Sequence, residues 1–168
     1  MDNDNALRVR AHHLHVPLRW IGTKDTIPKP PWKKGGYIIN LQDNATSDGK
    51  INPGTHWTAM HVDEDGIVYS DSFGFHPPAD LEVLLGKHRY IFTHRQIQDE
   101  HTGHCGKYAL YFLYFMSKPR GDMSLRDRVQ QFLNLWSKEP RDNLRRLNLY
   151  LDAALHHQDH ADHGAKQE

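Results

Sequence analysis

The sequence has little cysteine, no excess of charge and no long hydrophobic run, and each shortage excludes a class of protein. Its 168 residues include a single cysteine, Cys105. One thiol can form neither an internal disulfide nor an all-cysteine zinc site, so a disulfide scaffold is excluded and a reducing compartment is expected. Basic and acidic residues both total 21, which argues against a strongly basic nucleic-acid-binding protein. No apolar run approaches the ~20 residues of a membrane-spanning helix.

The pattern that is present is typical of one α+β domain, since compact domains usually hold about 100–200 residues. Short β-branched stretches predict strands over 37–41, 56–62, 66–70 and 89–93. From Cys105 the chain is apolar nearly all round, which predicts a central buried helix. Other helices are expected over 79–87, over 125–136 and from Pro140 onwards. We therefore predict a small mixed or antiparallel sheet packed on the helix that starts at Cys105, with further C-terminal helices.

The two ends of the chain are expected to be poorly ordered. Residues 1–10 are polar, and residues 156–168 (HHQDHADHGAKQE) show no apolar periodicity. Residues 14–21 carry apolar side chains but include Pro17, which restricts them to an edge strand or an extended segment. The predicted organisation is thus one domain over 1–155, followed by a disordered histidine-rich tail.

The position of Cys105 is the most informative chemical feature. It opens the apolar helix directly after a glycine-containing loop. The unpaired N–H groups and the positive dipole at a helix N-terminus stabilise a thiolate, and they can also bind a developing oxyanion. This is the setting that a nucleophilic cysteine needs. The alternative is a small buried core residue, which is what most free cysteines are.

A base and an orienting acid are available from the predicted hairpin. His56 begins one strand and Asp71 follows the end of its partner, fifteen residues on. Antiparallel pairing puts the start of one strand beside the end of the other, so the two side chains should lie close together. A base held by an acid in this way is what a cysteine nucleophile requires. Taken singly, His56 could equally be a surface histidine and Asp71 a turn residue.

Further polar residues lie just before the cysteine. Gln98, seven residues upstream, could donate to an oxyanion, with Gln96 as a competitor and an exposed glutamine as the ordinary alternative for both. His101 and His104 compete with His56 as the base, but neighbours on a helix do not share a face. The chain has 14 histidines but no HExxH motif, so no functional metal site is predicted.

These residues, in this order, resemble a known family. His56-Trp57, then Asp71-Ser72-Phe73-Gly74, then Gln98, then Cys105-Gly106 is similar to the adenain-like proteases (the adenovirus protease family) and to their relatives, the SUMO and ubiquitin-like-protein proteases. The resemblance covers roughly residues 14–120. Upstream, the segment from Pro17 to Trp57 is especially similar to compact proteases of DNA viruses and virus-like mobile elements.

The resemblance implies a cysteine endopeptidase with His56 as base, Asp71 as orienting acid, Gln98 as oxyanion donor and Cys105 as nucleophile. It implies cleavage after glycine-containing motifs, and Trp57 would wall a narrow groove that admits glycine, with plain strand packing as its alternative role. The implied substrates are viral structural precursors cut during virion maturation. The implied location is intracellular, in host cytoplasm or nucleus, or inside the virion.

The resemblance also bears on cofactors and partners. We expect no required cofactor and a monomer, with no membrane association. Some adenain-like enzymes use a disulfide-linked peptide, which this chain could bind only by consuming Cys105; stimulation by DNA or by a non-covalent peptide remains open, although zero net charge does not favour DNA.

Two other functions remain open. One is a protease that removes SUMO, ubiquitin or similar modifiers, which would use the same four residues. The other is a catalytically silent interaction module on the same fold, although such a module has no need of all four.

Overall fold

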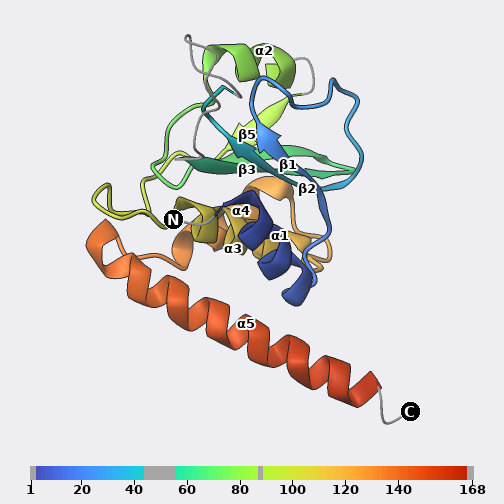
Figure 1. The fold of residues 1–168 in the computed structure, drawn as a ribbon, viewed down its shortest axis with the longest axis vertical. Helices are drawn as coiled ribbons and strands as arrows, with labels where there is room; N and C mark the ends of the chain where they lie inside the picture. Colours follow the sequence, from blue (N-terminus) through green and yellow to red (C-terminus); the bar gives the residue numbers. More distant parts are fainter. Residues whose placement is uncertain (1–2, 44–55, 87–88, 166–168) are drawn as a thin grey trace.

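In the computed structural model, residues 3–43, 56–86 and 89–165 are described, the last seven of these by their backbone alone. Within these ranges five strands form one mixed sheet in chain order (Figure 1): β1 (Leu18–Thr23), β2 (Gly35–Asn40), β3 (Trp57–Asp63), β4 (Gly66–Ser70) and β5 (Tyr90–Phe92). β1 and β5 run parallel to their neighbours, whereas β2, β3 and β4 pair antiparallel. The expected hairpin and the expected edge strand after Pro17 are both present. Residues 44–55, which end in the Pro53-Gly54-Thr55 segment before His56, lie outside the described ranges.

Helices cover both faces of this sheet, which gives the α+β fold predicted from the sequence. α1 (Asp4–His13), α3 (Cys105–Ser117) and α4 (Leu125–Asn134) lie on one face, and α2 (Ala79–Gly86) lies on the other (Figure 1). Neighbouring strand residues alternate between the faces, as β geometry requires. Ile38 and Val68 pack in the core on the α3 side, and Ile39 and Tyr69 pack in the core on the α2 side.

The central helix α3 begins at Cys105, as predicted. Its side chains are apolar around most of the circumference because the sheet, α1, α4 and α5 all pack against it. α4 falls within the predicted range 125–136 and begins with a cap, in which the Ser124 hydroxyl accepts a hydrogen bond from the Asp127 N–H at 3.1 Å. A short 3₁₀ turn, η1 (Pro140–Asp142), then leads into α5 (Asn143–Ala165).

The expectation for the N-terminus is wrong, because residues 4–10 belong to helix α1. Asn3 caps it, with its side-chain oxygen accepting from the Ala6 N–H at 2.8 Å. Leu7, Ala11 and Leu14 are at most 2% exposed and form the face that packs on the core. That spacing places the three on one side of a helix. The polar residues between them face solvent and masked the pattern in the sequence.

The expected disordered tail also differs, because α5 continues through residues 156–165. In Figure 1 the C-terminal end of this helix extends away from the rest of the molecule. Leu147, Leu151 and Ala154 anchor its first half in the core. Once a helix is nucleated by such packing, each further residue adds a backbone hydrogen bond at low cost, so weakly apolar sequence can follow. None of the helices within the described residues is long and apolar enough to cross a membrane.

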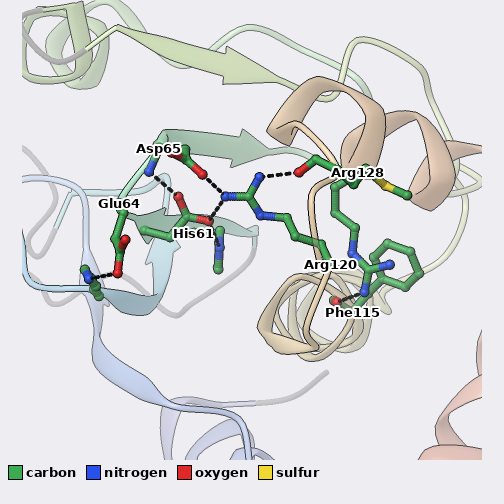
Figure 2. Close-up of polar contacts among 9 residues, drawn as sticks. His61, Glu64, Asp65, Phe115, Arg120 and Arg128 are labelled. Atoms are coloured by element: carbon green, nitrogen blue, oxygen red, sulfur yellow. Dashed lines mark hydrogen bonds and ion pairs between the residues drawn. The ribbon is translucent and has the colours of Figure 1, made fainter.

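A polar cluster fastens the hairpin loop to the connection between α3 and α4 (Figure 2). Arg120 contacts the carboxylates of Asp63 and Asp65 and donates to the Met123 carbonyl at 2.6 Å. His61 lies 3.2 Å from Asp63. The cluster sits at the end of β3, whereas His56 precedes its start, so it holds the sheet on the helices at a distance from the candidate site.

Candidate active site

The hairpin brings His56 and Asp71 together at one end of the sheet. β3 and β4 pair with Ala59 opposite Ser70, which places the residue before β3 beside those that follow β4. The His56 Nε2 lies 3.1 Å from the Asp71 Oδ1. Asp71 is 1% exposed, whereas the His56 side chain is 22% exposed. The proximity predicted from the hairpin is therefore present, and part of the imidazole remains accessible.

Cys105 lies at the same end of the sheet as His56 and Asp71, but it belongs to the helical layer that contains α3. As the first residue of α3 it lies at the helix N-terminus, and the Trp57 backbone N–H donates a hydrogen bond to its sulfur at 3.3 Å. Its side chain also hydrogen-bonds to His56. The thiol thus contacts a base that is itself held by an acid. Cys105 is only 3% exposed.

The next residue, Gly106, allows α3 to lie this close to its neighbours. A β-carbon there would come within 3.0 Å of the Leu7 side chain and 3.4 Å of the Trp57 ring. Packing therefore explains the glycine after Cys105, because the start of α3 lies close to both α1 and β3. This close approach fixes the position of the Cys105 sulfur relative to His56.

The electrostatics of His56 favour its protonated form. Burial by itself lowers the pKa of an imidazole, because it penalises the charged form. Hydrogen bonds to Asp71 and Cys105, together with the attraction of both groups, outweigh the burial and raise the pKa of His56 to about 9. At neutral pH the ring is therefore an imidazolium poised between a carboxylate and the sulfur.

Gln98 is close in sequence to this group but has its own contacts. It is fully buried, its Oε1 accepts from the Ser72 hydroxyl at 2.5 Å, and its Nε2 donates to the Thr102 carbonyl at 3.0 Å and hydroxyl at 3.2 Å. The structure thus joins Gln98 to the Asp71-Ser72 segment and to the loop before Cys105. Its role as oxyanion donor stays a prediction. The competitor Gln96 is exposed and donates to the Gln98 carbonyl at 2.9 Å.

Two residues beside Asp71 contact the site, and sequence reasoning gave them no role. Ser72 holds the Gln98 amide. Phe73 stacks on the His56 ring, with centroids 5.0 Å apart and planes inclined by 17°, and its N–H donates to Asp71 Oδ1 at 2.8 Å. The available signal was the hairpin register, which when continued past Ala59–Ser70 sets His56 opposite Phe73.

Gly74 completes this turn for a steric reason. Its φ is +81°, and a β-carbon would lie 2.7 Å from the backbone of Arg95 and Gln96. Only glycine allows that approach without strain. It brings the segment bearing Gln98 against the segment bearing Asp71.

Trp57 is 4% exposed and packs in the core on the α3 side, and its expected role as a groove wall stays a prediction. The alternative of strand packing describes the side chain better, because so little of it is left for a substrate to touch. The contribution of Trp57 to the site is its backbone N–H.

Two further histidines, His101 and His104, precede Cys105 in the chain. His101 is exposed and faces Glu100 at 3.7 Å, and His104 is the N-cap residue of α3. Across the part of the chain that the structure describes, no group of three or more histidine, cysteine and acidic residues could hold a metal ion.

No family model and no curated protein matches the chain. A solved structure of the SUMO protease Ulp1, with its catalytic cysteine oxidised to a sulfinic acid, aligns with 91% of this chain and 78% of its own, at a TM-score of 0.42 and 15% identity. A likeness this weak carries no argument about activity, which rests on the residues themselves.

Proposed function

We propose that this protein is a cysteine protease in which His56, Asp71 and Cys105 form the catalytic triad. One observation carries the proposal: His56 contacts both Asp71, at 3.1 Å, and the only cysteine of the chain. A buried structural cysteine needs neither a protonated imidazole nor the end of a helix beside it. The same constellation argues against a silent interaction module.

The chemistry follows from these positions. In the resting enzyme His56 already holds the Cys105 proton, so that the two residues form an imidazolium–thiolate pair. The thiolate attacks a peptide carbonyl, forming a carbon–sulfur bond and moving the carbonyl electron pair onto oxygen. The Cys105 N–H and Gln98 stabilise this oxyanion. When the intermediate collapses, the carbon–nitrogen bond breaks and His56 gives its proton to the leaving amine. Water then hydrolyses the thioester and restores the thiol.

The burial of Cys105 supports a substrate with small residues at the cleaved bond. With only 3% of the residue exposed, a peptide carbonyl reaches the sulfur when its flanking side chains take little room. Glycine satisfies this condition, in keeping with the cleavage after glycine that the sequence resemblance implies.

Two substrate classes follow from that resemblance, viral structural precursors and ubiquitin-like modifiers. Nothing in the described structure speaks for the first. Nothing in the described structure separates it from the second, so the experiment tests both classes side by side.

The test incubates the protein with fusions of SUMO and ubiquitin to a reporter, and with precursor peptides containing Gly-Gly or Gly-X-Gly, and maps the cuts by mass spectrometry. We expect cleavage after glycine by the wild type and none by Cys105→Ala. Cleavage that persists in Cys105→Ala would overturn the proposed function. The Ser137→Ala variant, which removes a hydroxyl from the connection after α4, is the matched folding control.

A further inference from the structure

Ser72 connects the two halves of the candidate site. Its backbone follows Asp71, and its carbonyl accepts hydrogen bonds from the N–H groups of Ile97 and Gln98 at 2.9 and 3.0 Å. Its hydroxyl lies 2.5 Å from the Gln98 Oε1. Ser72 is only 5% exposed, so water competes little for these contacts.

The donors and acceptors around Gln98 allow one orientation of its amide. The Oε1 can only accept, so the Ser72 hydroxyl must be the donor. At the other end the Thr102 carbonyl can only accept, so the nitrogen must face it, at 3.0 Å. Turning the amide by half a rotation would set its oxygen against the Thr102 carbonyl oxygen, and the Ser72 hydroxyl would then accept from the amide N–H and leave its own hydrogen without this partner.

We propose that Ser72 is a positioning residue for the oxyanion-stabilising amide: its hydroxyl fixes the oxygen end of Gln98, so that the nitrogen end is the one presented toward the Cys105 loop. This rests on the proposed function, in which Gln98 is the oxyanion donor. An amide turned the other way would direct an oxygen lone pair at the oxyanion and raise the barrier. Ser72 itself touches neither the nucleophile nor the reacting carbonyl.

The second hydrogen of the Gln98 nitrogen is the one that serves the oxyanion. The Thr102 carbonyl holds the nitrogen at 3.0 Å, and the Thr102 hydroxyl makes the longer contact, at 3.2 Å. That hydroxyl already donates to the Asp99 carbonyl at 2.8 Å. A fully charged oxyanion is the stronger acceptor and replaces the hydroxyl in the transition state.

The chain offers a matched control in Ser70. Ser70 and Ser72 are both 5% exposed, and each makes one buried hydrogen bond through its side chain. Ser70 accepts from the Thr93 hydroxyl at 3.0 Å and does not contact Gln98. Ser70→Ala therefore removes a similar buried bond from the same strand region while leaving the amide in place.

The experiment compares Ser72→Ala, Ser70→Ala, Gln98→Ala and the Ser72→Ala/Gln98→Ala double variant. We expect Ser72→Ala to lower kcat roughly 10- to 100-fold with KM nearly unchanged, and Ser70→Ala to stay within about threefold of wild type. The double variant should be no slower than Gln98→Ala, because one residue acts through the other. Equal losses in Ser72→Ala and Ser70→Ala, or losses that multiply in the double variant, would overturn the proposal.

Two reagents separate the oxyanion contact from the nucleophile. A peptide aldehyde ending in glycinal forms a hemithioacetal, in which the sulfur bonds to carbon and the former carbonyl oxygen sits where the oxyanion forms. Iodoacetamide alkylates the thiol by displacing iodide and creates no such oxygen. We expect Ser72→Ala to weaken aldehyde binding roughly tenfold or more and to leave the alkylation rate unchanged. Equal weakening of both reactions would contradict a positioning role.

The orientation of the amide can be measured without any activity. In the NMR spectrum the Gln98 side-chain amide signals are identified by their loss in Gln98→Ala. We expect them to exchange slowly with solvent in wild type and in Ser70→Ala, and to shift and exchange faster in Ser72→Ala. Unchanged signals in Ser72→Ala would overturn the positioning of Gln98 by Ser72. The signals could change as expected while the wild type cleaves no substrate and binds no aldehyde. In that case the proposed function is wrong, but the positioning of the Gln98 amide by Ser72 is confirmed.

Discussion

The Phe73 ring lies over the imidazole of His56, with 5.0 Å between centroids and 17° between planes. The stack covers one face of the imidazole, while the Asp71 carboxylate holds its Nε2. Two contacts from the same turn, one from Asp71 and one from Phe73, therefore fix both the position and the tilt of the ring. An imidazolium gains further stability over an aromatic face, about 0.5–1 kcal/mol at a partly exposed site.

This contact predicts a pH effect for Phe73→Leu. Leucine keeps much of the volume and the burial but removes the aromatic face that favours the charged ring. The pKa of His56 should fall by about half a unit, so the high-pH limit of kcat/KM should move to lower pH by the same amount. Phe75→Leu, at the exposed neighbouring phenylalanine, is the control and should leave the profile in place. A shift to higher pH in Phe73→Leu would contradict the stacking argument.

A second prediction concerns the coupling of His56 to Cys105. The pKa of His56 is raised from 6.5 to about 9 because its hydrogen bonds to Asp71 and Cys105 outweigh burial. A raised pKa of this kind stabilises the fold fully below pH 6.5, and the stabilisation is lost as pH rises through 9. The free energy of unfolding should fall by up to about 3 kcal/mol over that window.

In Cys105→Ala the sulfur partner is absent and only Asp71 remains. NMR titration of the His56 ring should give a lower pKa than in wild type, and denaturant unfolding should show a smaller decline with pH. An identical titration in both proteins would mean that the thiol and the imidazole are not coupled.

The third prediction distinguishes the base from the nearby histidines. His56→Ala should lower kcat/KM by at least about 10²-fold, because general acid–base catalysis by one positioned side chain is worth that much or more. His101→Ala should change it little, since that side chain is 83% exposed and faces only Glu100. His104→Ala should also lower it far less than His56→Ala does, because His104 occupies the N-cap position of α3 without a side-chain cap hydrogen bond. Near-normal cleavage by His56→Ala would refute the proposed triad.

The sequence predicts those parts of the site whose residues belong to a strong local sequence pattern. The apolar run after Cys105 predicted α3 and its first residue, and the short loop between two β-rich stretches predicted the hairpin that pairs His56 with Asp71. These are local signals, and each contact follows from one element. The contact of Phe73 with His56 could be read from the hairpin register. The contacts of Ser72 depend on how a turn meets the loop before α3, which no single stretch of sequence specifies.

The misses in the fold have the same origin. In α1, tertiary packing of Leu7 and Ala11 outweighs the polar composition of the first residues. At the other end, packing of the first half of α5 carries the helix into residues whose sequence has no apolar face. The inward position of Trp57 follows from α3 lying on β3, again a contact between distant segments.

The last prediction concerns Gln98. An oxyanion donor acts on charge that exists only in the transition state, so removing one costs ~10²–10³ in kcat while KM stays nearly constant. Gln98→Ala should still react with iodoacetamide at Cys105 at the wild-type rate. Because the glutamine is fully buried and bonded to Ser72 and Thr102, the variant should also be less stable, and kcat is therefore measured well below its melting temperature.

Gln96→Ala is the control for Gln98→Ala. The Gln96 side chain is exposed and donates a hydrogen bond to the Gln98 carbonyl, so this variant should lose little kcat. Equally mild losses of kcat in Gln98→Ala and Gln96→Ala would mean that residues 96–98 contribute only to packing. The backbone amides at the start of α3 would then be the groups that bind the oxyanion.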